Sequence, residues 1–154
     1  MKYKDYKVGF TFEVPDYLSE VREASYEVFN VAENTLKYFI MLDDDGEIVR
    51  SFSFSKDEAP VKTDTAYKEV LEKNLQAMED LGLTKLINTE FTTAKGIHVD
   101  RYVYVDLEMD EAIGLLLYFA RIKDSLVVSS CYISNFDDFF ETEMRNIYES
   151  IEVL

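Results

Sequence analysis

Short stretches of alternating apolar and polar residues, joined by tight turns, constrain the fold of this chain more than any other feature. The first places Val8, Phe10, Phe12 and Val14 on one parity, and Pro15 follows. Side chains of a strand point alternately to its two faces, so this stretch predicts a half-buried strand that ends at Pro15. Successive strands joined by tight turns pair in antiparallel fashion. The pattern therefore predicts an antiparallel sheet.

The same kind of evidence predicts further strands along the chain. They cover residues 25–31, 36–42, 48–54, 88–93, 97–107, 113–122 and 126–133. The stretch 113–122 is apolar on both parities, which is typical of an interior strand covered on both faces. Turns are predicted at 43–46, 94–96 and 123–125, where Asp, Gly, Lys and Ser gather.

Two stretches have helical spacing instead. The first runs over 65–81, with Thr63 or Asp64 as its N-terminal cap, and the second runs over 136–151. Each carries an apolar stripe that must pack on something. We therefore expect one α+β domain over residues 1–154. It should have a single antiparallel sheet of about six to eight strands, flanked by two main helices.

The charge of the chain limits its partners. There are 31 Asp and Glu residues against 16 Lys and Arg, which gives a formal net charge of −15. Such a chain repels phosphate backbones and anionic lipid surfaces, so no nucleic acid is expected. A protein or peptide partner with a basic segment is favoured, with an apolar docking segment as the alternative. The plain explanation is that the charge only keeps the domain soluble.

The lengths of the apolar stretches bear on membrane insertion and on the location of the protein in the cell. The longest, residues 112–120, is far shorter than the roughly 20 residues that span a bilayer. The first seven residues are charged and lack the apolar region of a signal peptide. We therefore expect no membrane insertion and a cytoplasmic location.

The order of elements resembles the PsbP-like superfamily. The resemblance is carried by the opening segment 9–15, the helix over 65–81, the strand that begins Gly96-Ile97-His98-Val99 and the closing helix. Its members include extrinsic photosystem proteins, a Ran-binding nuclear import factor, bacterial envelope lipoproteins and chaperones of type VI secretion effectors. The resemblance implies an antiparallel sheet flanked by helices and a binding or accessory role, without shared catalytic residues. We expect the chain to differ from the envelope lipoproteins, because no leader peptide or acylation cysteine can be recognised in the sequence.

A single histidine and a single cysteine limit the chemistry that the chain can perform. Any Ser-His-Asp or Cys-His site must use His98, and a zinc site with several histidines cannot be assembled. On the predicted strand 97–107, His98 and Asp100 share one face. Cys131 belongs to a neighbouring strand, where a free thiol is usually inert and buried. A small hydrolase or ligand-binding enzyme using His98 with Asp100 or Cys131 is thus the alternative function.

The acidic run 43–47 resembles a calcium loop only superficially. With Gly46 at position 6 of an EF-hand loop, Met41 falls at position 1 and Phe52 at position 12, and neither can bind calcium. The run therefore predicts a solvated hairpin tip and no metal site. The glycine-rich signatures of nucleotide binding are absent, so no cofactor is expected.

Three tyrosines are the candidate binding residues, together with His98. Tyr102, Tyr104 and Tyr118 lie on predicted strands, and tyrosine offers large contact area with a polar tip. The alternative is that they form a sheet face under a helix, because aromatic residues are enriched in strands. The leading interpretation is a non-enzymatic binding or accessory domain, chaperone-like toward a protein partner.

Overall fold

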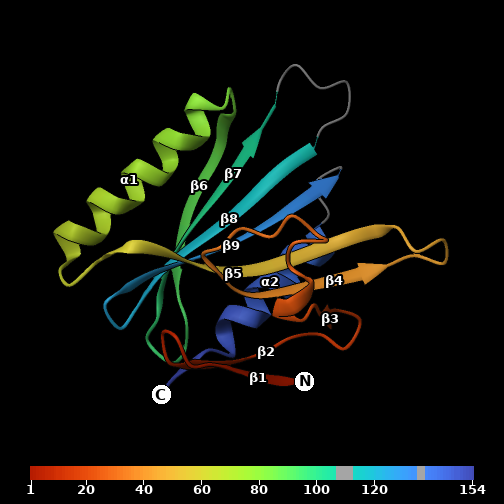
Figure 1. Cartoon of the computed structure of the whole chain (residues 1–154). Helices are drawn as coiled ribbons and strands as arrows, with labels where there is room; N and C mark the ends of the chain where they lie inside the picture. The colour runs from red at the N-terminus through yellow and green to blue at the C-terminus, as the bar shows by residue number, and fades with distance from the viewer. Residues whose placement is uncertain (107–112, 135–137) are drawn as a thin grey trace.

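The structure is a computed structural model that describes residues 1–106, 113–134 and 138–154. Figure 1 shows a twisted sheet with a helix on each side of it. The helices are α1 (Asp64–Asp80) and α2 (Asp138–Glu149), with one 3-10 turn at Glu23–Ser25. The strands are β1 (Lys2–Asp5), β2 (Phe10–Glu13), β3 (Ser19–Glu20), β4 (Thr35–Leu42), β5 (Ile48–Pro60), β6 (Thr84–Thr92), β7 (His98–Val105), β8 (Ile113–Ile122), β9 (Ser125–Ser134) and β10 (Glu152–Val153).

The predicted antiparallel sheet is confirmed, and a second sheet accompanies it. Within the described residues the large sheet has seven strands in the order β3-β4-β5-β9-β8-β7-β6. Every neighbouring pair in it is antiparallel. A small sheet has the order β1-β2-β10 and joins the two ends of the chain. The fold is therefore α+β, as expected, but not a single sheet.

Each face of the large sheet has its own core. On one face, side chains from α2 and β2 pack against β4, β5, β7, β8 and β9. On the other, α1 packs against β7, β8 and β9. Strand β8 contributes Leu116 and Tyr118 to the first core and Leu117 and Phe119 to the second. Its prediction as an interior strand covered on both faces is confirmed.

Helix α1 begins and ends where its sequence predicts. Thr63 has extended backbone angles, and its Oγ1 accepts a hydrogen bond from the Ala66 N–H at 3.0 Å, as an N-terminal cap does. Beyond the helix, Gly82 has a φ of +87°, a conformation that favours glycine. The buried side chains of α1 all face the sheet; they are Tyr67, Val70, Leu71 and Leu75.

Two predictions of secondary structure are wrong. No strand forms over residues 25–31, where turns follow the 3-10 turn and Asn30 has a φ of 53° that interrupts extended backbone. The Phe29 ring packs on Tyr38 instead, with ring centroids 6.3 Å apart. The second helix ends at Glu149 rather than 151, because the chain then turns and β10 pairs with β2. Its predicted start at 136 lies outside the described residues.

Tyr148 of α2 joins the helix to the sheet at the centre of the first core. Its side chain is fully buried, and its ring stacks on that of Tyr118 with centroids 5.1 Å apart. The Tyr148 hydroxyl lies 2.5 Å from the Oγ of Ser129, which is also fully buried. Each hydroxyl therefore satisfies the other in a place that water does not reach.

Replacing Tyr148 with Phe should cost about 1–3 kcal/mol of unfolding free energy, because the buried Ser129 hydroxyl loses its partner. Urea unfolding of the variant measures this loss. Removing both hydroxyls should cost less than the sum of the two single changes, since no polar group is then left unpaired. If Tyr148→Phe/Ser129→Ala costs the full sum of Tyr148→Phe and Ser129→Ala, the two hydroxyls do not depend on each other.

Candidate functional site

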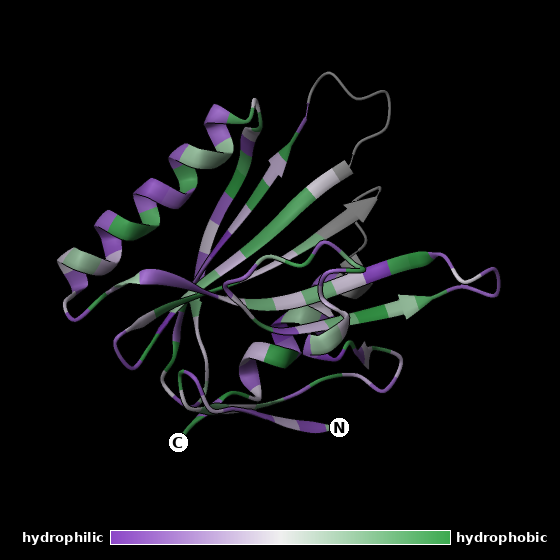
Figure 2. Ribbon diagram, in the orientation of Figure 1, coloured by the Kyte–Doolittle hydropathy of each residue, from purple (hydrophilic) through white to green (hydrophobic). Residues whose placement is uncertain are grey.

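Strands β4 and β5 extend beyond the body of the molecule as a hairpin, which projects at the right of Figure 1. We call residues 42–49 the hairpin arm; every one of them is exposed. Leu42, Ile48 and Val49 are 51%, 45% and 47% exposed. Figure 2 shows hydrophobic residues on both strands of the arm beside a hydrophilic tip. The hairpin arm thus exposes large apolar side chains to solvent.

The tip of the hairpin arm is held by its first aspartate. One oxygen of Asp43, Oδ1, accepts hydrogen bonds from the backbone N–H groups of Asp45 and Glu47, both at 2.9 Å. Gly46 completes the turn with a φ of +81°. The carboxylates of Asp44, Asp45 and Glu47 remain exposed. The arm therefore combines apolar side chains with negative charge, which suits a segment that is both apolar and basic.

Calcium should leave the melting temperature of the protein unchanged. One carboxylate oxygen of Asp43 already accepts two backbone hydrogen bonds within the turn, and the other acidic residues of the arm lack the spacing of a calcium loop. A site specific for the folded state would raise stability by about 2.7 kcal/mol at a hundredfold excess over its dissociation constant. Thermal unfolding with and without millimolar calcium checks this, with magnesium as the control. A saturable rise with calcium alone would contradict it.

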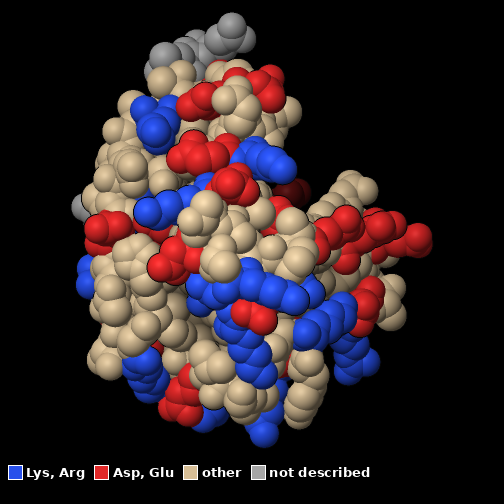
Figure 3. Space-filling view, turned by 90° about the vertical axis from the view of Figure 1, so that its left-hand side faces the viewer, with Lys and Arg blue, Asp and Glu red and all other residues tan. Residues whose placement is uncertain are grey.

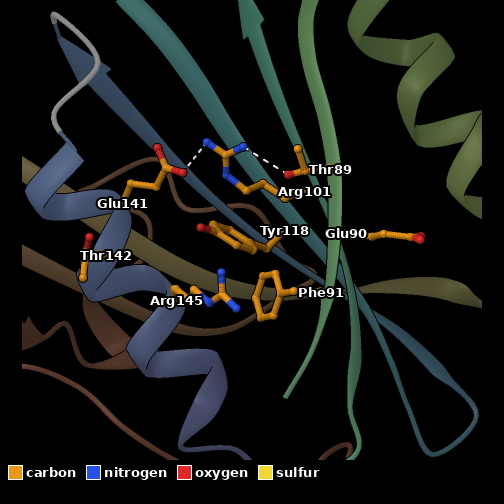
Figure 4. Close-up of a pocket in the computed structure, with 8 residues that line it drawn as sticks. All are labelled: Thr89, Glu90, Phe91, Arg101, Tyr118, Glu141, Thr142 and Arg145. Carbon is orange, nitrogen blue, oxygen red and sulfur yellow. Dashed lines mark hydrogen bonds and ion pairs between the residues drawn. The ribbon is translucent and has the colours of Figure 1, made fainter. Parts of the chain in front are cut away.

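A second candidate is a cavity of about 460 Å³ between α2 and strands β6, β7 and β8. Thr89, Arg101 and Tyr118 are register partners on these three strands and point to the same face, beneath α2. Figure 4 shows their side chains facing Glu141 and Arg145 of the helix. Glu90, one residue after Thr89, points away from the cavity, as the alternation of a strand requires.

The charges in this cavity largely offset each other. The Arg101 guanidinium is ion-paired with Glu141 and donates to Thr89 Oγ1 at 3.2 Å. The Arg145 guanidinium lies over the Phe91 ring, 4.4 Å from its centroid. Burial raises the pKa of Tyr118 to about 12, so its hydroxyl stays protonated at neutral pH. These contacts attach α2 to the sheet, and they hold no activated nucleophile.

Replacing Glu141 with Gln should therefore destabilise the fold. The Arg101 side chain is only 12% exposed and would lose its counter-charge. Breaking a fully buried pair costs about 3–5 kcal/mol, and the 31% exposure of Glu141 reduces the expected loss to about 1–3 kcal/mol. Urea unfolding measures it. Glu143→Gln, on the same helix, is the control. An equal loss of unfolding free energy in both variants would show that the ion pair of Arg101 with Glu141 does not stabilise the fold.

The predicted tyrosines do not form one surface. Tyr102 and Tyr104 are 6% and 0% exposed and lie beneath α1, whereas Tyr118 belongs to the core on the opposite face. The alternative interpretation, a sheet face under a helix, therefore describes all three: Tyr102 and Tyr104 lie beneath α1, and Tyr118 lies beneath α2. Burial is also the main cause that raises the pKa of Tyr102, to about 12.

His98 lies beside Asp100, as the alternation predicts, and away from Cys131. The His98 Nε2 is 3.4 Å from Asp100 Oδ1, and the His98 side chain is about half exposed. Cys131 is 2% exposed in the core beneath α2, where its Sγ lies 3.0 Å from Met144 Sδ. Since His98 points to the α1 side of the sheet, the proposed pair of His98 with Cys131 does not form.

Three features of these sites could not be predicted from the sequence. Glu90 joins His98 and Asp100 because β6 pairs with β7 in a register that no local pattern reveals. Arg101 meets Glu141 because α2 packs over that face of β7, which no local pattern reveals either. The hairpin arm was predicted as a turn, and its alternation continued the strands without showing that they leave the body. A charge inside an apolar strand, as at Arg101, is the one signal that pointed to a partner.

Comparisons with known proteins concern the fold. No family model matches the sequence, and no curated protein is similar to it in sequence. Several solved structures are similar. One is the solution structure of cyanobacterial PsbP (CyanoP) from Synechocystis sp. PCC 6803, with a TM-score of 0.69 and 16% identity over 100% of this chain and 92% of that one. The chain has the PsbP-like fold.

Two other structures extend this likeness. The Saccharomyces cerevisiae Ran-binding protein Mog1p has a TM-score of 0.61 and 12% identity over 99% of this chain and 94% of that one. A Pseudomonas aeruginosa protein of unknown function has a TM-score of 0.56 and 13% identity, covering 97% and 94%. At such identities the likeness establishes the PsbP-like architecture and no specific activity. Among the described residues, no helix is both long and apolar enough to cross a membrane.

Proposed function

We propose that this domain binds a protein partner without chemical turnover, and that the hairpin arm docks a segment of that partner which carries apolar and basic residues. The observation behind the proposal is the exposure of Leu42, Ile48 and Val49 beside a cluster of carboxylates. Exposed apolar groups that lie together and are rimmed by polar residues mark interaction sites more often than scattered ones do.

The geometry of the arm suits docking. Leu42 and Ile48 are register partners across the hairpin, and Val49 is the extra residue of a bulge between that pair and the pair Met41 and Arg50. Cross-strand partners hold their side chains close together, so the patch is formed before a partner arrives. A preformed patch avoids part of the ordering cost of association.

Electrostatics supports the same partner chemistry. The arm adds Asp44, Asp45 and Glu47 to a chain whose net charge is −15. Such a field accelerates the encounter with cationic surfaces and disfavours anionic ones. The yeast Ran-binding protein, which has the same fold, supports a protein partner in general but not this surface. A hydrolase using His98 and Asp100 remains the alternative function.

Capture of the partner by variants of the arm tests the proposal. The purified domain, immobilised through one terminus, is exposed to a lysate of the organism that encodes it, and retained proteins are quantified by mass spectrometry. A partner retained by the unmodified domain should be lost from Ile48→Ser/Val49→Ser. It should also fall away as salt rises above about 0.15 M, where screening shortens to ~8 Å.

The matched control is Val28→Ser, because Val28 is 80% exposed and lies outside the arm. It should capture the partner as the unmodified domain does. Equal capture by the arm variant and the control would remove the arm from the interface. Turnover of a small substrate that disappears in His98→Ala, with the fold intact, would overturn the binding function itself.

A further inference from the structure

Three possible metal ligands meet on the α1 side of the sheet, near the β6–β7 turn. They are Glu90 of β6 with His98 and Asp100 of β7, and one ligand atom from each lies within 4.8 Å of the other two. Among the described residues, no other group of three or more His, Cys, Asp or Glu side chains brings its ligand atoms this close together. It includes the single histidine of the chain.

The register of two strands produces the cluster. Glu90 and Asp100 are direct partners across β6 and β7, and His98 lies two residues before Asp100. Residues two apart on a strand share a face, so all three side chains leave the sheet on the same side. The ligands therefore come from paired strands rather than from a loop, which makes their relative positions rigid.

The spacing of the ligand atoms fits a tetrahedral ion. His98 Nε2 lies 3.4 Å from Asp100 Oδ1 and 3.5 Å from Glu90 Oε2. Two ligands at the usual zinc distances of about 2.0–2.1 Å are about 3.3 Å apart when the angle between them is tetrahedral. The cluster is thus close to the spacing that an ion would impose, and a small adjustment of the exposed Glu90 side chain completes it.

The surroundings orient the central carboxylate. The Tyr67 hydroxyl of α1 donates to Asp100 Oδ2 at 2.7 Å, which leaves Oδ1 toward the histidine. Hydrogen bonds of this kind fix ligating carboxylates in known metal sites. The Tyr67 hydroxyl oxygen also lies 3.2 Å from the backbone carbonyl oxygen of Phe119, so its position is determined by the core.

The positively charged side chains near the cluster are ion-paired with other carboxylates. Figure 3 shows Lys and Arg side chains in a band across the lower half of the face that carries α1. Lys95 and Arg121 line a cavity of about 370 Å³ together with His98. Lys95 is ion-paired with Glu152 at 2.8 Å, and Arg121 with Asp64 at 3.2 Å. Their charges are therefore offset locally by other carboxylates, and the carboxylates of Glu90 and Asp100 lie beside His98.

We propose that Glu90, His98 and Asp100 bind one divalent transition-metal ion of the zinc class, with Tyr67 orienting Asp100. Imidazole and carboxylate ligands together suit zinc and its neighbours, whereas calcium and magnesium prefer oxygen alone. Three protein ligands leave a fourth position for water or a ligand. This site is independent of the hairpin arm.

The single histidine makes the test direct. Tag-free protein is titrated with zinc chloride while the imidazole signals of His98 are followed by NMR. They should shift and saturate at one equivalent, and magnesium or calcium should not move them. Glu90→Gln and Asp100→Asn should each weaken the apparent affinity about tenfold or more, and Tyr67→Phe by a smaller factor.

The control is Asp44→Asn, which removes a carboxylate of the hairpin arm and should leave zinc affinity unchanged. If the His98 signals shift without saturating, or if Glu90→Gln and Asp100→Asn bind zinc as tightly as the unmodified protein, the histidine binds alone and the proposed site is wrong. Retained far-UV circular dichroism shows that each variant is folded. A variant that fails to fold is replaced by Asp100→Ser or Glu90→Ala, neither of which keeps a carboxylate, and binding must still weaken.

Discussion

The packing of Tyr148 against the large sheet is the interaction on which the rest of the structure depends. Its ring contacts Tyr118 and Phe54, and its hydroxyl contacts Ser129, so one side chain of α2 touches three strands. Phe54 in turn packs against Phe10 and Phe12 of the small sheet. The helix, the two sheets and both ends of the chain are therefore joined through one aromatic core, which suits a chain with 11 Phe, 11 Tyr and no Trp.

The opposite face is covered less evenly, and this leaves room for function. Helix α1 packs on β7, β8 and β9, where Leu117 and Phe119 are buried. Toward β5 the same face carries Ser53 and Ser130, whose hydroxyls lie 3.5 Å apart and line a cavity together with residues 29–32. Because β4 and β5 are not bound beneath α1, they can extend beyond the body as the hairpin arm.

The sequence predicted those parts of the fold in which local pattern and tertiary context agree. Helix α1 has a cap at Thr63, a single apolar face and a glycine after its end, and the sequence predicts all three. The small sheet was not predicted, because β1 has four residues and β10 has two, and both are too short to show a strand pattern of their own. The strand expected at 25–31 failed for another reason: its composition suits a strand, but its backbone closes local turns, in which the N–H groups of Val28 and Asn30 donate to the carbonyls of Ser25 and Glu27.

The candidate sites depend on register, which sequence alone does not supply. Strand β6 contains a bulge at Leu86, since Lys85 pairs with Tyr104 and Ile87 with Val103. From that point onward the pairing is continuous to Thr92 and His98. A shift of one residue would move every side chain of β6 to the other face of the sheet.

One register therefore determines two charge clusters on opposite faces of the same strands. Thr89 meets Arg101 beneath α2, where the guanidinium binds Glu141 and attaches the helix. Glu90, the next residue, meets Asp100 on the α1 side, where His98 faces both carboxylates. The pairing of β6 with β7 thus places Thr89 and Arg101 on the face that α2 covers, and it assembles Glu90, Asp100 and His98 on the opposite face.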